Sequence, residues 1–308
     1  MKMKWPNGKA FALSIVDDTD NGTVSNVKPV YDFLYSHGLR TTKTAWAFPP
    51  RDRFSGQCLQ DEDYRCFIQD LDAKGFEIGF HNAGSGDFSR QETIVALEFF
   101  AKCIGKYPRL HVNHADNPDN IYWGHKRFSA AVAMVYRAIR KGYSPEGEIE
   151  DSPRFWGDYC KKHIAYIRNR VFSGINTMAR DPRMPCRYRH KDQYSNYWFS
   201  SSDGANKDVF SRLLAKDHVD RLARDGGCCI VYTHFASGFV DANGQLDAGF
   251  QERIEYLAKQ DGWFAPTSSI LDYMKDHGGS TYTGSMYDTW LDIVWLVQRA
   301  GRRLWLRV

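Results

Sequence analysis

The chain has 308 residues, of which 43% are apolar and 15% aromatic, enough to build a sizeable hydrophobic core. This composition excludes intrinsic disorder, collagen-like sequence and small disulfide-stapled scaffolds. Lysine and arginine number 41 and aspartate and glutamate 37, so the net charge is +4, and the basic residues form no long run. Since nucleic-acid binders concentrate positive charge, we expect no nucleic-acid partner.

Seven cysteines, an odd number, occur without any Cys-x-x-Cys spacing. A complete disulfide framework is therefore excluded, and a cysteine-rich zinc site is not expected. No apolar stretch is long enough to predict a membrane-spanning helix. The first apolar run is short and leads directly into Asp17 and Asp18, which predicts a core strand and not a signal peptide. We expect a cytoplasmic protein with reduced thiols.

Short apolar runs alternate with segments of helical periodicity. The expected strands are 11–16, 41–48, 76–80, 110–113, 227–232 and 263–264. The expected helices are 27–37, 61–74, 89–104, 250–260 and 268–275. This alternation is typical of βαβ units and a parallel sheet, which gives an α/β fold. Because the sequence carries no glycine-rich phosphate-binding fingerprint, a barrel is favoured over a Rossmann sheet.

Residues 125–205 carry aromatic residues, prolines and charges without a clear period. We expect this segment to consist of helices and long loops inserted between barrel strands, acting either as a lid or as a dimer contact in a homo-oligomer. Residues 1–280 then form one barrel domain, and 281–308 form a helical C-terminal tail.

The tail combines tryptophans with arginines, which leaves two interpretations open. One is a basic amphipathic helix that lies on a membrane surface. The other is a helix docked on the barrel with its arginines outward, which is favoured because the tail also carries Asp288 and Asp292. The residues in question are Trp290, Trp295, Trp305, Arg299, Arg302, Arg303 and Arg307.

Carboxylates and histidines follow several of the expected strands, and in a parallel barrel these strand ends meet on one face. Each residue taken alone could be a helix cap, a turn residue or a satisfied histidine. Together they predict a site for a divalent ion such as zinc, with an open position for water. The residues are Asp17, Asp18, Asp20, His81, Asp87, His111, His114 and His234.

Four segments resemble motifs of the polysaccharide deacetylase (NodB-homology, carbohydrate esterase 4) family: ALSIVDDTDNGT, GFEIGFHNAG, CCIVYTHF and WFAPTSSILDYM. They occur in the family's order and span about residues 9–275. The resemblance implies a distorted (β/α) barrel with inserted helices and loops. It also implies metal-dependent hydrolysis of an N-acetyl or related amide on a sugar.

By position in these motifs, the resemblance implies that Asp17 is the general base and that Asp18 and His81 are metal ligands. It implies that His234 is the general acid. In such chemistry the metal polarises the carbonyl and lowers the pKa of its bound water. A carboxylate takes the water's proton, and an imidazole protonates the leaving nitrogen, because an amine leaves poorly as an anion.

The sequence departs from the family where a second ligand histidine is usual, four residues after the first, because Ser85 stands there. Either Asp87 replaces the lost ligand, or His114 (less readily His111) reaches in from the next strand end, or the metal site is lost. The family's Arg-Pro-rich third motif is also absent, and VNHADNPDNIYWG stands in its place. These departures indicate a divergent subgroup.

Further residues are candidates for substrate contact, and each also has a structural interpretation. An asparagine can bind hydroxyl groups or hold a turn, and a tryptophan can stack on a sugar or pack in the core. Arg90 either binds an anion or orients Asp17, or it lies on a solvated helix face. Lys43 lies within an expected strand, so it either points into a polar barrel mouth, which we favour, or pairs with an acid such as Asp17. The candidates are Asn113, Lys43, Arg90, Trp123 and Trp198.

We therefore predict a hydrolase that uses a divalent metal, with zinc as the first choice, to remove an N-acetyl or related acyl group. The expected substrate is a sugar or a small N-acylated amine. The alternative is a catalytically silent carbohydrate-binding protein that keeps the deacetylase barrel. An isomerase or lyase on the same barrel is a weaker third hypothesis.

Overall fold

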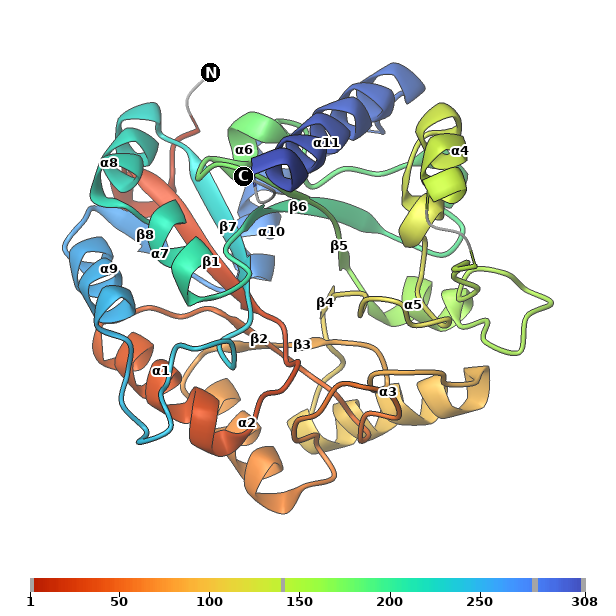
Figure 1. Ribbon diagram of the computed structural model, residues 1–308, viewed down its shortest axis with the longest axis horizontal. Coiled ribbons are helices and arrows are strands. Elements are labelled where there is room, and N and C mark those ends of the chain that lie inside the picture. The colour runs from red at the N-terminus through yellow and green to blue at the C-terminus, as the bar shows by residue number, and fades with distance from the viewer. Residues whose placement is uncertain (1–2, 140–141, 279–281, 306–308) are drawn as a thin grey trace.

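The computed structural model describes residues 3–139, 142–278 and 282–305, with the backbone alone for 302–305. Its centre is an all-parallel sheet in which β1 to β7 follow one another around a closed ring (Figure 1). The strands are β1 (Phe11–Asp17), β2 (Thr42–Ala45), β3 (Glu77–Phe80), β4 (Leu110–His111), β5 (Tyr166–Phe172), β6 (Tyr197–Asp203), β7 (Cys228–Thr233) and β8 (Gly262–Phe264). The predicted distorted (β/α) barrel is confirmed.

Strand β1 closes the ring, and all seven of its residues are buried, as expected for a parallel strand covered on both faces. One edge of β1 pairs with β7, which places Asp17 opposite Thr233. The other edge pairs with β8 at Phe11–Leu13 and then with β2, which places Asp17 opposite Lys43. The carboxyl ends of β1, β2 and β7 therefore meet at one end of the barrel.

Helices surround the barrel (Figure 1). Two of them begin at capping boxes, Thr23 with Asn26 and Ser89 with Glu92, in which each side chain binds the other residue's backbone amide. The flanking helices are α1 (Val24–Ser36), α2 (Glu62–Ala73), α3 (Arg90–Ile104), α7 (Lys207–Leu213), α8 (Lys216–Asp225), α9 (Ala248–Ala258) and α10 (Thr267–Gly278). The helices predicted from periodicity are confirmed to within a few residues at each end.

The expectation that 125–205 is only an insertion between barrel strands is wrong, because this segment supplies β5 and β6 to the ring. The sequence of β5, YIRNRVF, carries two arginines that hid its strand character. Both arginines are buried, and each is paired with an acid more than 120 residues away. The segment also holds the 3-10 helices η2 (Gly124–Arg127) and η3 (Arg189–Lys191), and helices α4 (Ala130–Ile139), α5 (Gly157–His163) and α6 (Thr177–Arg180).

The tail forms helix α11 (Ser285–Trp305), which packs against α4 and β5. Leu291 and Trp295 are buried in this contact, and the carboxylate of Asp292 lies 2.5 Å from the guanidinium of Arg170. The tail is therefore docked on the barrel, as the favoured interpretation predicted, and Arg299 is exposed. The side chains of Arg302, Arg303 and Trp305, and all of Arg307, lie outside the described residues.

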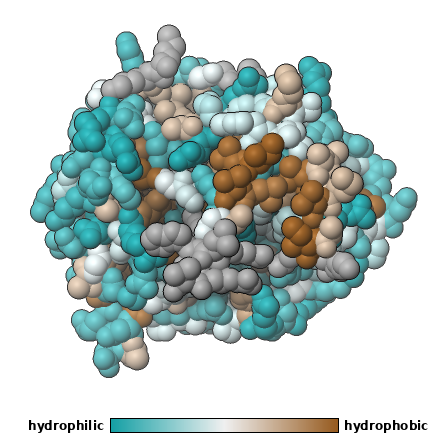
Figure 2. Space-filling view, turned by 45° about the horizontal axis from the view of Figure 1, so that its top comes forward, coloured by the Kyte–Doolittle hydropathy of each residue, from teal (hydrophilic) through white to brown (hydrophobic). Residues whose placement is uncertain are grey.

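The outer side of α11 exposes a row of apolar side chains, Met286, Trp290, Ile293 and Val297. Helix α4 adds further exposed apolar residues, and Figure 2 shows a brown area on this face of the molecule. Among the helices that the structure describes, none is long and apolar enough to cross a membrane.

Candidate metal centre

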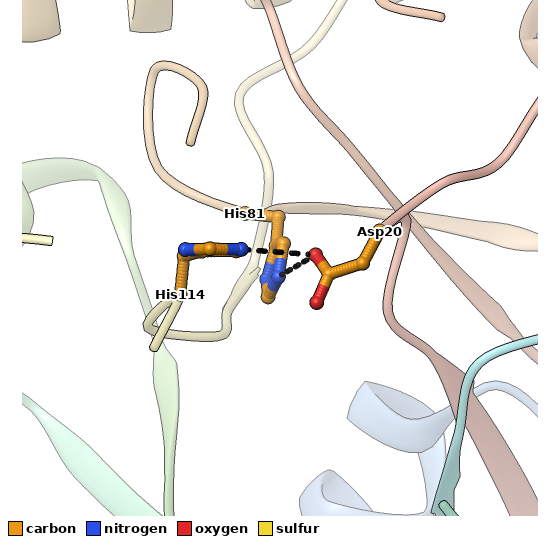
Figure 3. Close-up of side chains that lie close together, drawn as sticks. All are labelled: Asp20, His81 and His114. Carbon is orange, nitrogen blue, oxygen red and sulfur yellow. Dashed lines mark hydrogen bonds and ion pairs between the residues drawn. The ribbon is translucent and has the colours of Figure 1, made fainter. Parts of the chain in front are cut away.

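Three side chains meet at the carboxyl ends of the barrel strands: Asp20 after β1, His81 after β3 and His114 after β4 (Figure 3). Oδ1 of Asp20 lies 3.2 Å from Nε2 of His81 and 3.2 Å from Nε2 of His114. One ligand atom from each residue lies within 4.8 Å of the others, and all three residues are buried. The barrel brings them together because parallel strands end on the same face.

The ring of His114 is oriented by its other nitrogen. Nδ1 lies 3.1 Å from Oδ1 of Asn117 and 3.4 Å from Oγ of Ser85. Asn117 is itself fixed, because its amide nitrogen donates to the carbonyl of Gly84 and its oxygen accepts from the amide of Gly86. Nε2 of His114 is therefore aimed at Asp20. Metal-binding histidines are commonly held in this way through the nitrogen that does not bind the ion.

These residues fit a divalent ion. Nε2 of His114 is buried, and within the described part of the chain the Asp20 carboxylate oxygen 3.2 Å away is the group that it faces. The imidazole nitrogen and the carboxylate oxygen point at one another, as two ligands of one ion do. One carboxylate and two imidazoles are ligands that zinc prefers, and three protein ligands leave a position for water. Ligand atoms about 2.1 Å from a tetrahedral zinc ion lie about 3.4 Å apart. The two 3.2 Å separations from Asp20 are close to this value.

His234, directly after β7, approaches the same carboxylate from another side. Its Nε2 lies 3.2 Å from Oδ2 of Asp20, and its Nδ1 donates to the carbonyl of Ala205 at 3.0 Å. Burial by itself would lower the pKa of His234, but the hydrogen bond to Asp20 and the charge of Asp18 outweigh it and raise this pKa to about 9. Nε2 of His234 therefore carries a proton at neutral pH.

Asp20 responds in the opposite direction. Burial would raise the pKa of its carboxyl, but the hydrogen bonds from His114, His234 and His81 outweigh it and hold the pKa well below the usual value. A carboxylate that stays ionised is available to a cation over the whole neutral pH range.

Asp18 lies beside this cluster and is held by Arg168 of β5. The guanidinium donates two hydrogen bonds to the carboxylate, of 2.8 and 2.5 Å, and both side chains are about 95% buried. Two-pronged contacts of this kind fix the position and orientation of a carboxylate. The ring of Tyr232 packs against the same guanidinium at 4.5 Å.

A cavity of about 410 Å³ opens on this cluster. Asp18, Asp20, His81, Arg168 and His234 line it on the side of the strand ends. A second set of lining residues comes from η2 and the residue before it, α4 and α11, and we call this set the arginine wall. Its members are Trp123, Arg127, Tyr136, Trp295, Gln298 and Arg299.

The structure places Asp17 outside this cavity. Its Oδ2 lies 2.9 Å from Nζ of Lys43 and accepts from the hydroxyl of Tyr31, and its Oδ1 accepts from the amide of Phe235. Asp17 and Lys43 are both fully buried, so the pair ties β1 to β2. The expectation that Lys43 points into the barrel mouth is therefore wrong, and the alternative of pairing with Asp17 is what the structure contains.

Asp87, His111 and His114 were the candidates for the ligand that Ser85 cannot supply, and the structure places them in three different surroundings. Asp87 is largely exposed and bound by Arg154, away from the cluster. Both ring nitrogens of His111 contact oxygens, the carbonyl of Phe80 and the amide of Asn113, and burial lowers its pKa to about 3. Of the candidates, His114 is the one that reaches the cluster.

Of the residues expected to contact substrate, Asn113 and Trp123 line the cavity. Asn113 already bonds the backbone amide and carbonyl of Ile121, so its amide holds the loop. The structure places two others elsewhere. Arg90 pairs with Asp158 on the outside of the barrel, and Trp198 is buried in the core.

The sequence listed Asp20 among the acids of the predicted ion site but gave it no role, because the adjacent pair Asp17 and Asp18 matched the family motif. Other residues that the structure brings to the cavity were missed. Arg168 lies in the segment without a clear period, so no sequence signal marked it. The arginine wall depends on the docking of α11, which no local pattern specifies.

No protein-family model matches this sequence, and no curated protein matches it by sequence. Solved structures do match. Puue allantoinase superposes with a TM-score of 0.56 at 13% identity, over 90% of this chain and 94% of the other. A probable polysaccharide deacetylase from Pseudomonas aeruginosa PAO1 gives 0.53 at 13% identity, over 90% and 94% of the two chains. A putative polysaccharide deacetylase from Mycobacterium smegmatis gives 0.51 at 11% identity, over 92% and 96%. This chain therefore has the polysaccharide deacetylase fold that its motifs predicted.

Proposed function

We propose that this protein is a metal-dependent hydrolase that removes an N-acetyl or related acyl group from a sugar or a small N-acylated amine. The observation that carries the proposal is the cluster of Asp20, His81 and His114. A fixed carboxylate, Asp18, and a protonated imidazole, His234, face the same cavity. The deacetylase fold supports the same reaction class.

Asp20, His81 and His114 would hold the ion, which when bound polarises the substrate carbonyl and activates water. The carboxylate of Asp18 would accept the proton of the attacking water, since Arg168 holds it at the cavity surface. In this proposal Asp18 takes the general-base role expected for Asp17, and Asp20 takes the ligand role expected for Asp18. The reason is that the carboxylate of Asp17 is enclosed by its own partners.

His234 would donate a proton to the leaving nitrogen. The carbonyl of Ala205 accepts the Nδ1 hydrogen, so the transferable proton is on Nε2, which faces Asp20. Protonation is needed because the amine is a poor leaving group as an anion. The cavity volume of about 410 Å³ is within the range of small-molecule sites.

Elemental analysis of protein purified without chelator or a histidine tag tests the metal site. We expect about one divalent ion per chain, and we expect His114→Ala to lose it. Asp87→Ala is the matched control, because Asp87 is the competing candidate and lies outside the cluster. The ligand assignment is overturned if no ion binds in excess zinc, or if Asp87→Ala and not His114→Ala releases it.

Acetate release from N-acetylated sugars and amines then tests the reaction. Turnover that requires the bound ion supports a hydrolase. A loaded protein that binds sugars without releasing acetate would instead favour the silent carbohydrate-binding alternative.

A further inference from the structure

Arg127 of the arginine wall is a buried cation that no carboxylate of the described residues neutralises through an ion pair. The residue is 6% exposed, yet it lines the cavity. One guanidinium nitrogen donates to the carbonyl of Asn169 at 3.3 Å, and Nε has no hydrogen-bond partner among the residues that the structure describes. No ion pair within the described segments joins Arg127 to a carboxylate. Burial accordingly lowers its pKa to about 10. An uncompensated buried charge is costly, so a partner for it is expected.

The surroundings of Arg127 position the guanidinium without neutralising it. The rings of Trp123, Phe128 and Trp295 lie 4.4, 4.7 and 4.6 Å from it. Cation–π contacts of this kind offset part of the cost of burial and fix the orientation of the cation. They leave its positive charge in place.

Both cations and anion-forming groups surround Arg127. Arg170 and Arg299 lower its pKa, and Tyr136 and Asp292 raise it. The carboxylate of Asp292 is already held by Arg170 and by the amide of Ser129. Arg299 of α11 lies over the ring of Trp295 at 5.5 Å and lines the same cavity. Two guanidinium groups therefore face one part of the cavity, and no carboxylate of the described chain is paired with either.

From this geometry we infer that the arginine wall binds an anionic group, a phosphate or a carboxylate, on the substrate. Guanidinium groups bind both anions through paired hydrogen bonds. The cavity is shared by this wall and the candidate metal centre, so one molecule can reach both. Resting on the proposed function, the inference defines the substrate class as an N-acylated sugar or amine that also carries a negative charge.

Calorimetric titration with three related probes tests the inference on the zinc-loaded protein. The probes are neutral N-acetylglucosamine, its 1-phosphate, and N-acetylmuramic acid, which carries a carboxylate. We expect at least one anionic probe to bind about tenfold more tightly than the neutral sugar, as charged hydrogen bonds allow. The stronger of the two anionic probes identifies phosphate or carboxylate as the preferred group. Equal binding of all three probes would overturn the inference.

Two variants test whether the arginine wall is the source of the preference for anionic probes. Arg127→Met and Arg299→Met are expected to reduce the anionic preference, and Arg137→Met is the matched control, because Arg137 is exposed on α4 and does not line this cavity. If Arg127→Met fails to fold by circular dichroism, Arg299→Met decides, since Arg299 is at the surface. A preference that is unchanged in every folded wall variant contradicts the inference. Binding is read without turnover, so a failure of the proposed hydrolysis is seen separately, as missing acetate release.

Discussion

The carboxylate of Asp18 and the guanidinium of Arg168 meet through two hydrogen bonds, although 150 positions separate them in the sequence. The contact joins the end of β1 to the middle of β5 across the barrel. It fixes the one carboxylate of the Asp17–Asp18 pair that faces the cavity. This contact and other buried acids of the barrel can be tested in four experiments.

Arg168→Lys keeps the positive charge but removes the planar two-pronged contact with Asp18. We expect turnover to fall about 100-fold, because a small displacement of a reacting group has an effect of this size. Metal content is expected to stay at the wild-type value. Arg170→Lys is the matched control on the same strand, since its partner is Asp292, outside the candidate centre. Equal loss of turnover in both variants would mean that Arg168 acts through stability alone.

Asn substitutions separate the two adjacent aspartates. Asp18→Asn is expected to lower turnover about 1000-fold with the metal retained, because it removes the proposed base. Asp17→Asn is expected to lower the free energy of unfolding by about 3–5 kcal/mol, because it leaves the buried ammonium of Lys43 unpaired. The folded fraction of that variant should keep its turnover. Asp18→Asn also removes the partner of the buried Arg168, so both variants are expected to lose stability. The turnover of the folded fraction, measured by urea unfolding alongside the rate assay, distinguishes them, and the reverse pattern would return the base to Asp17.

The buried carboxyl of Asp119 is expected to make the free energy of unfolding depend on pH. Burial raises the pKa of this carboxyl to about 7, although Asn82 donates a hydrogen bond to it. Between about pH 4 and pH 7 the folded chain therefore keeps a proton that the unfolded chain has lost. The stabilisation that protonated Asp119 gives the fold is fully present below about pH 4 and is lost as the pH rises through about 7. Over this range the free energy of unfolding falls by at most about 1.4 kcal/mol per pH unit.

The test for Asp119 compares urea unfolding of the wild type and Asp119→Asn between pH 5 and pH 8. The variant should lose less stability than the wild type over this range, because its amide does not titrate. Parallel curves for the two proteins would contradict the assignment.

Asp292 holds α11 on the barrel through Arg170 and the amide of Ser129. Asp292→Ala leaves the Arg170 guanidinium buried without its partner, which is expected to cost about 3–5 kcal/mol of unfolding free energy. Limited proteolysis should then cut the tail earlier than in the wild type. Asp217→Ala, at an exposed acid of α8, is the control and should leave the cleavage pattern unchanged.

The sequence by itself determined the barrel and most of its strands, because buried parallel strands are short apolar runs whose pattern is local. It also marked His81, His114 and His234, because each follows such a run or lies in the loop after it. The sequence on either side of each histidine is enough to identify it as a candidate site residue.

The tertiary structure decided which acids face the cavity and where the charged strand β5 lies. An arginine can be buried in a strand when an acid meets it, and for Arg168 and Arg170 these acids are 150 and 122 residues away. Asp17 is turned from the cavity by Lys43, its neighbour on β2. Such pairings depend on strand register and on helix docking, which arise only when the whole chain has folded. A local sequence pattern therefore cannot predict them.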